Sequence, residues 1–452
     1  MNSLLGHPAL VLLLSSTTMV AGCGDEDDHA ASRFAWLALR AEQVRELSFD
    51  SAVPVRTVTR GEVDAEAQQA ADALAEEELE ALAATYGRLG YFSPDADLRA
   101  ILGGSQDLAA AWYSSADKAI ALIGEVEDHV LIHEYVHGLQ DQHFDLGALG
   151  DALLTSDAHL ALRAAAEGDA MLAEVRYLQQ ERNDADLDRL SWAPVIASIH
   201  AAGEEVLQES EVPALFVDYP SFAYGFGFEY CAHNLTGASA AAPVAREPFP
   251  FDWSREDALF SQRTPATTQQ IIALDDQDPE VRVGLEELPA ELADELEPLD
   301  WDSMGEWLWY LLLRPLDGTP ELGDMRALAA AWDGDRALFV RDRKTGATGT
   351  AWASAWDDGE AAAGIEAALW RLYGGEAIDG GEPRLGQAED GELVWIERRE
   401  ERVVALKNVD QALMTALAEA AFPAGIEPKR LALRKRPSLA ARLSRHLPAR
   451  PR

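Results

Sequence analysis

Residues 130–139, Val-Leu-Ile-His-Glu-Tyr-Val-His-Gly-Leu, contain the pattern His-Glu-x-x-His. Positions i and i+4 share one face of an α-helix, so His133 and His137 can both reach one metal ion. Glu134 then lies beside the open coordination position, where a carboxylate can accept a proton from water. Glu134 is the only charged residue of the segment, as expected of a buried active-site helix. The pattern therefore predicts a zinc (Zn2+) site with His133 and His137 as ligands and Glu134 as general base.

A catalytic zinc needs a third protein ligand, and two residues compete for this role. His143 follows His137 at the metzincin spacing, but Gln140 stands where that pattern has a helix-ending glycine. A continued helix would turn His143 away from the other two histidines. Glu167, on a helix expected at 156–182, has small and apolar neighbours among which an unpaired carboxylate would be costly. These arguments favour Glu167 as the third ligand, with His143 as the alternative.

The N-terminal residues have the pattern of an export signal. Residues 10–14 form an apolar core, which precedes small residues and the sequence Val-Ala-Gly-Cys at 20–23. This core is too short to span a membrane and is typical of a signal peptide. Val-Ala-Gly-Cys resembles a bacterial lipobox, which implies lipidation of Cys23. We therefore expect an exported protein that is lipid-anchored to the cell envelope, on the periplasmic face or the cell surface.

The composition restricts the class of partner. The net charge is −42, from 79 acidic and 37 basic residues. Nucleic acid is excluded as a partner because phosphate binding requires a basic surface. The expected partners are a peptide or protein substrate and, through the N-terminal anchor, a membrane.

A further donor is expected for the oxyanion that develops during hydrolysis. The segment 219–231 is rich in aromatic residues and glycine. Tyr224 is the candidate donor from this segment, and His233 is the alternative. Aromatic residues in such a segment also suit a hydrophobic core.

The pattern of apolar residues divides the chain into five parts. We expect helices at 64–89, 156–182, 305–313 and 359–373, two strands within 111–123, strands at 336–342 and 348–356, and a hairpin at 393–406. The strands at 111–123 would place a sheet edge above the metal helix, where an extended substrate can bind by strand addition. The predicted parts are a signal peptide (1–22), an acidic tether (23–60), a catalytic domain (61–295), a small α+β domain (296–422) and a basic tail (423–452).

Residues 133–146 and 167–170 together resemble a group of uncharacterised bacterial and archaeal secreted zincin-like proteins of the gluzincin type. Weaker similarity extends over residues 263–271, 332–336 and 352–357, and so covers most of residues 65–400. The resemblance implies a zincin fold, His133, His137 and Glu167 as zinc ligands, and Glu134 as base, but no known substrate. The implied fold class is α+β: a mainly helical zincin-like domain with a small antiparallel sheet, then a smaller α+β domain.

The chain departs from the gluzincin pattern at one position. Gluzincins often carry an acidic residue four positions after the ligand Glu, and here that residue is Met171. Asp169 lies on a different helical phase. The side chain that orients the histidines is therefore unassigned, with Asp141 as a candidate.

Together these patterns predict an exported, membrane-anchored zinc metallopeptidase. Two alternatives remain open: a non-catalytic surface lipoprotein that uses the scaffold to bind a partner, and a zinc hydrolase that acts on a non-peptide bond. Glu134 favours catalysis, because a scaffold that only binds has no need of a general base.

Overall fold

The computed structural model describes residues 26–422 except 105–109, 182–191, 210–211, 238, 240–251, 276, 286–287, 320–321, 375, 378–383 and 389–390. The predicted signal peptide, the predicted lipidation site at Cys23 and the basic tail lie outside the described residues. Among the described helices, none combines the length and apolar character needed to cross a membrane. The described part is an α+β protein with two sheets, as the sequence predicted.

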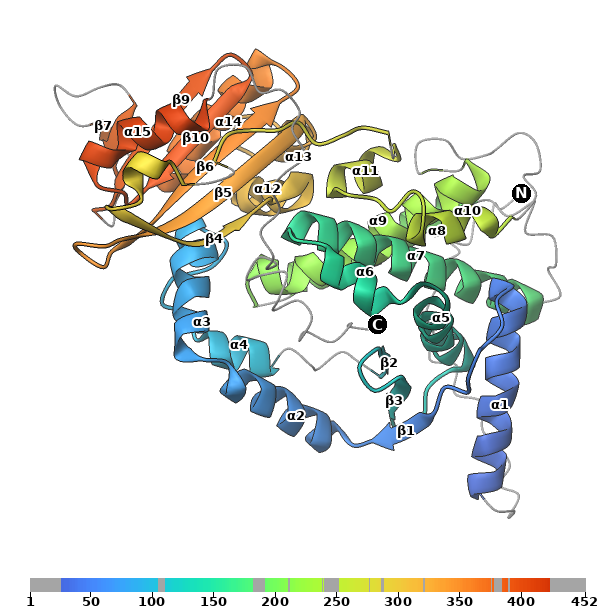
Figure 1. The fold of residues 1–452 in the computed structure, drawn as a ribbon. Coiled ribbons are helices and arrows are strands. Elements are labelled where there is room, and N and C mark those ends of the chain that lie inside the picture. Colours follow the sequence, from blue (N-terminus) through green and yellow to red (C-terminus); the bar gives the residue numbers. More distant parts are fainter. Residues whose placement is uncertain are drawn as a thin grey trace, which may run out of the picture.

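Long helices form the body of the first part of the chain (Figure 1). They are α1 (Glu26–Arg45), α5 (Asp128–Phe144), α7 (Ser156–Glu181), α8 (Trp192–Glu209) and α9 (Ala214–Thr236). This part also contains the short helices α4 (Leu98–Gly104), α6 (Leu146–Ala152), α10 (Ser254–Asp257) and α11 (Thr268–Ala273). The long helix predicted at 156–182 is confirmed. Its buried face is rich in alanine, which lets neighbouring helices approach closely.

Two glycines set the distance between α7 and α9. A Cβ atom added at Gly168 would lie 2.1 Å from the carbonyl oxygen of Gly227, and one at Gly227 would lie 2.1 Å from that of Ala164. The two backbones therefore touch at this crossing, and only glycine fits there. Because Gly168 follows Glu167 directly, this crossing also fixes the position of the Glu167 carboxylate.

We expect Gly168→Ala to destabilise the protein by about 3 kcal/mol, because the added methyl group meets rigid backbone. Gly203→Ala in α8 is the matched control, since its Cβ would meet nothing within 4 Å. Alanine there should raise stability by about 1 kcal/mol through helix propensity. Urea unfolding of both variants measures the difference, and equal stabilities would contradict the close crossing.

The first sheet has three strands in the order β1-β3-β2. The strands are β1 (Val55–Val58), β2 (Ala111–Ser114) and β3 (Ala119–Ile123). The strand pair predicted within 111–123 is confirmed, and β2 is an edge strand that packs against α5. The prediction of an antiparallel sheet was wrong in one respect. β1 pairs with β3 in parallel, because the chain returns to the sheet through a long helical crossover.

The prediction of an acidic tether at residues 23–60 was wrong over its described part. Residues 26–45 form α1, in which Leu37, Ala41 and Val44 are fully buried. Their spacing of i, i+4 and i+7 is that of one helical face. The acidic residues that precede this face suggested a solvated segment, but a helix needs only one apolar stripe in order to pack.

The single helix predicted at 64–89 is divided in the structure. α2 (Arg60–Ala73) and α3 (Glu76–Leu82) are separate helices, and a π-helical turn follows at Ala83–Gly87. α2 begins earlier than predicted because Thr59 and Glu62 form a capping box. It ends near Leu74, where the Arg99 side chain donates hydrogen bonds to the carbonyls of Ala71 and Leu74. This tertiary contact stabilises an interruption that local propensity does not indicate.

A seven-stranded antiparallel sheet forms the second part, in the order β4-β5-β6-β10-β9-β8-β7. Its strands are β4 (Leu296–Asp302), β5 (Trp332–Asp342), β6 (Thr348–Trp356), β7 (Glu376–Ala377), β8 (Leu385–Gln387), β9 (Leu393–Arg399) and β10 (Arg402–Lys407). The helices α14 (Gly359–Tyr373) and α15 (Gln411–Ala421) pack against it. The predicted strands, helix and hairpin of this region are confirmed.

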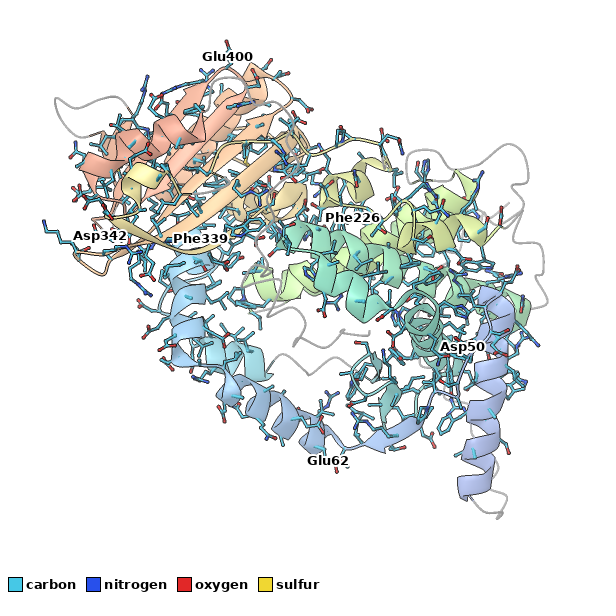
Figure 2. The ribbon with its side chains drawn as sticks, viewed as in Figure 1. Asp50, Glu62, Phe226, Phe339, Asp342 and Glu400 are labelled. Atoms are coloured by element: carbon cyan, nitrogen blue, oxygen red, sulfur yellow. The ribbon has the colours of Figure 1, made fainter. Side chains whose placement is uncertain are left out.

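The sheet packs against the helical part through α12 (Gly305–Leu313), α13 (Met325–Ala329) and the turn after α3. The helix predicted at 305–313 is confirmed. Phe339 of β5, labelled in Figure 2 where the sheet meets α3, lies with its ring 5.7 Å from the ring of Tyr86. Figure 2 also labels Phe226 of α9, whose ring centre lies 5.3 Å from that of Trp307 on α12. The two parts therefore share a continuous core.

A buried carboxyl group on α10 makes stability depend on pH. Burial, and then the nearby Asp169, raise the pKa of Glu256 to about 8. An exposed Glu in the unfolded chain has a pKa of about 4.3, so the folded state binds a proton that the unfolded state lacks between these values. This contribution to stability is complete below pH 4.3 and declines by up to about 1.4 kcal/mol per unit as the pH rises to 8.

We expect Glu256→Gln, which mimics the protonated form, to remove this pH dependence. Urea unfolding at pH 5 and pH 8 should show the wild type losing more stability than the variant. The exposed Glu127 offers the control Glu127→Gln, which should lose as much stability between pH 5 and pH 8 as the wild type does. Equal losses of stability between pH 5 and pH 8 in the wild type and in Glu256→Gln would contradict the raised pKa of Glu256.

Candidate metal centre

Three side chains from two helices meet in the buried space between α5 and α7. His133 and His137 lie one turn apart on α5, and Glu167 projects toward them from α7. All three are at least nine-tenths buried. In the described part of the chain, they are the one group of three or more His, Cys, Asp or Glu side chains with the arrangement to hold an ion. The three residues predicted as ligands therefore lie together.

The distances between the three ligand atoms fit zinc. The His133 Nε2 atom lies 3.2 Å from Glu167 Oε2 and 3.1 Å from His137 Nε2, and His137 Nε2 lies 3.3 Å from Glu167 Oε2. Zinc–nitrogen and zinc–oxygen bonds of about 2.1 Å in tetrahedral geometry require ligand atoms about 3.4 Å apart. The triangle is thus close to one face of a zinc tetrahedron. A donor set of two imidazoles and one carboxylate also favours zinc over calcium or magnesium, which prefer oxygen ligands.

The electrostatics of the cluster favour an ionised carboxylate. Burial alone would raise the pKa of Glu167, but the charges and hydrogen bonds of His137 and His133 lower it well below its usual value. Burial lowers the pKa of His133, yet hydrogen bonds to Glu167 and Glu174 outweigh it and raise that pKa to about 10. The two imidazoles thus concentrate positive charge around Glu167. A divalent cation would take the same place by displacing these protons.

Glu134 points to the side of α5 that faces the first sheet. Its Oε2 atom accepts a hydrogen bond of 2.7 Å from the backbone N–H of Tyr113, on the edge strand β2. Desolvation raises the pKa of Glu134, and the nearby His133 and His137 oppose this rise. A buried carboxyl group with a raised pKa is a stronger base than an exposed one and is suited to accept and return a proton.

The residue that orients His137 is not the predicted Asp141. The Asp141 carboxylate instead accepts hydrogen bonds from the Tyr113 hydroxyl and the Lys118 ammonium, at 2.6 and 2.7 Å. Asp141 therefore ties the β2–β3 hairpin to α5. Its position one turn after His137 suggested proximity, but side chains at i and i+4 diverge when each has a stronger partner elsewhere.

Gln140 and Glu174, rather than Asp141, contact the two imidazoles. Gln140 Oε1 lies 2.9 Å from His137 Nδ1, and Glu174 Oε2 lies 3.4 Å from His133 Nδ1. In the sequence, Gln140 stands where the metzincin pattern has glycine, and no role at the metal site was predicted for it. Its spacing of i+3 from His137 was an available signal. Glu174 lies two turns after Glu167 on the same helix, which was also readable from the sequence.

His143 does not approach the cluster. α5 continues to Phe144, and the His143 Nε2–H group donates a 2.8 Å hydrogen bond to the carbonyl oxygen of Ser48. The expectation that continued helix would turn His143 away is confirmed. The reason is that Gln140 does not interrupt the helix as glycine would.

Tyr224 lies near the cluster, and His233 lies further along the same helix. The Tyr224 ring centre is 6.4 Å from that of His133. Both residues belong to α9, and His233 lies nine residues further along it, about 13 Å at the helical rise. Of the two candidates for oxyanion stabilisation, the fold therefore brings Tyr224 to the site.

Comparisons with known proteins assign no activity. Residues 295–418 match a family model described only as a domain of unknown function (DUF8575). This match covers the seven-stranded sheet and excludes the cluster of His133, His137 and Glu167. The chain matches no curated protein and no solved structure.

Proposed function

We propose that this protein is a zinc-dependent metallopeptidase of the gluzincin type, with a zincin-like helical domain. The observation that carries the proposal is the nearly tetrahedral face formed by His133, His137 and Glu167, with Glu134 adjacent in sequence. Zinc held there would supply Lewis acidity toward a scissile carbonyl and a water molecule. The proposal includes export and lipid anchoring through Cys23, which the lipobox-like sequence supports.

The residues of the chain have distinct tasks in this mechanism. Glu134 accepts the proton of the attacking water and transfers it to the leaving amine. The Tyr113 N–H group holds the Glu134 carboxylate in place through its 2.7 Å hydrogen bond. Tyr224, beside His133, is the candidate donor to the developing oxyanion. The edge strand β2 offers backbone groups along which an extended peptide can align.

Metal analysis and a peptide screen test the proposal. The purified full-length chain should contain about one zinc per molecule. A peptide library should be cleaved, and a chelator should abolish cleavage until zinc is restored. Iron or no metal after reconstitution would contradict the zinc site. Stoichiometric zinc without cleavage of any peptide would instead support a binding lipoprotein or a hydrolase for non-peptide bonds.

A further inference from the structure

A continuous line of hydrogen bonds leads from His137 to the N-terminal helix. Gln140 Oε1 lies 2.9 Å from His137 Nδ1, and Gln140 Nε2 donates to Asp169 Oδ2 at 2.7 Å. Behind Asp169, the Arg45 Nε–H group donates to the same carboxylate at 2.9 Å. Gln140, Asp169 and Arg45 are all fully buried. Three segments distant in sequence thus converge behind one metal-binding imidazole.

This arrangement determines which nitrogen of His137 carries the proton. Gln140 Nε2 faces two acceptors, the Asp169 carboxylate and the Ala166 carbonyl at 2.9 Å, so the amide has one favourable orientation. The Gln140 carbonyl oxygen must then face His137, where it can only accept a hydrogen bond. His137 therefore donates through Nδ1–H, and Nε2 is the nitrogen that faces the cluster and can bind a metal ion once its proton is displaced.

Arg45 holds the far end of this line. It pairs with Asp169 at 2.8 Å and with the partly exposed Asp257 at 2.6 Å, and its guanidinium lies 4.4 Å from the centre of the Trp253 ring. Replacing Arg45 would leave a buried charge at Asp169 with no cationic partner among these contacts. Without the guanidinium, the Asp169 carboxylate is no longer held in place against Gln140 Nε2, and the Ala166 carbonyl alone would orient the amide.

We propose that Arg45 is a positioning residue of the metal centre. Through Asp169 and Gln140, it holds His137 in the tautomer that binds metal through Nε2. Helix α1 is then part of the metal site as well as part of the core. The proposal rests on the metal-binding part of the proposed function, and it is independent of the substrate that is cleaved.

The competing explanation is that Arg45 only attaches α1 to α7. Arg176 provides a matched control, because it joins the same two helices through the Val44 carbonyl at 2.7 Å and Glu46 at 2.8 Å. Arg45→Met and Arg176→Met should both lower stability. We expect zinc affinity to fall about 10–100-fold in Arg45→Met and to stay near wild type in Arg176→Met. Arg45→Lys, which keeps the charge, should recover part of the loss.

A double-mutant cycle distinguishes action through Gln140 from a general loss of packing. Gln140→Ala should weaken zinc binding by itself, and adding Arg45→Met to it should cause no further loss. Additive losses, or unchanged affinity in Arg45→Met, would overturn the proposal. All affinities are measured by chelator competition on the full-length chain, in buffer where each variant is folded by circular dichroism.

A second readout needs neither metal nor activity. In full-length protein labelled with 15N-histidine, the Nδ1–H proton of His137 should be hydrogen-bonded and slow to exchange with water. Gln140→Ala identifies its resonance, and Arg45→Met should accelerate its exchange, whereas Arg176→Met should not. If the wild type binds no zinc, the proposed function fails but this measurement still decides the inference. Unchanged exchange in Arg45→Met would refute it.

Discussion

Replacing Glu134 with glutamine is expected to lower kcat for peptide hydrolysis by about 10²–10⁴-fold, the range attributed to general acid–base catalysis. Glutamine has nearly the same shape, and its carbonyl oxygen can still accept the hydrogen bond from the Tyr113 N–H group. It cannot accept a proton from water. Zinc content should therefore remain near one per chain, and KM should change little. Steady-state kinetics together with elemental analysis measure both quantities.

The control for this experiment is Glu127→Gln at the start of α5, where the side chain is exposed and makes no capping hydrogen bond. That variant should retain wild-type kcat. Full activity in Glu134→Gln would exclude Glu134 as the base. Loss of zinc together with activity would show instead that Glu134 supports the cluster, so a role in proton transfer would no longer follow.

Glu167→Ala should remove zinc binding, whereas His143→Ala should leave it intact. Glu167 Oε2 lies 3.2 and 3.3 Å from the two imidazole nitrogens, while His143 binds the Ser48 carbonyl. Losing a direct ligand should reduce affinity by more than the 10–100-fold that is typical of outer-shell changes. Alanine also leaves two buried imidazoles without their carboxylate.

Thermal unfolding with and without zinc gives an independent measure of the same prediction. At about 1,000 times Kd, a ligand that binds only the folded state stabilises it by about 4 kcal/mol. This zinc-dependent increase in Tm should appear in the wild type and in His143→Ala, and should disappear in Glu167→Ala. An increase that persists in Glu167→Ala and is absent in His143→Ala would reverse the assignment of the third ligand.

Short-range patterns predicted several elements well. Alternation and helical spacing located α7, α12, α14 and the β9–β10 hairpin, because each buries one face whose period is visible in the sequence. The same method missed α1, whose buried residues Leu37, Ala41 and Val44 follow an acidic run. It also joined α2 and α3, because the contacts of Arg99 that end α2 come from a residue outside the pattern.

The sequence by itself determined that His133 and His137 share one face of a helix and that Glu134 lies beside them, because the period of the α-helix places i and i+4 together. It also favoured Glu167 over His143, since a continued helix turns His143 away. Only the tertiary structure decided that Gln140, Asp169 and Arg45 stand behind His137, and that Asp141 belongs to the hairpin instead. Apart from the His137–Gln140 pair, which is three positions apart on one helix, these contacts join residues more than twenty positions apart. The packing of α1, α5 and α7 determines which of these residues meet. The Gly168–Gly227 crossing fixes the position of α7, and no short-range pattern in the sequence shows that these two glycines are in contact.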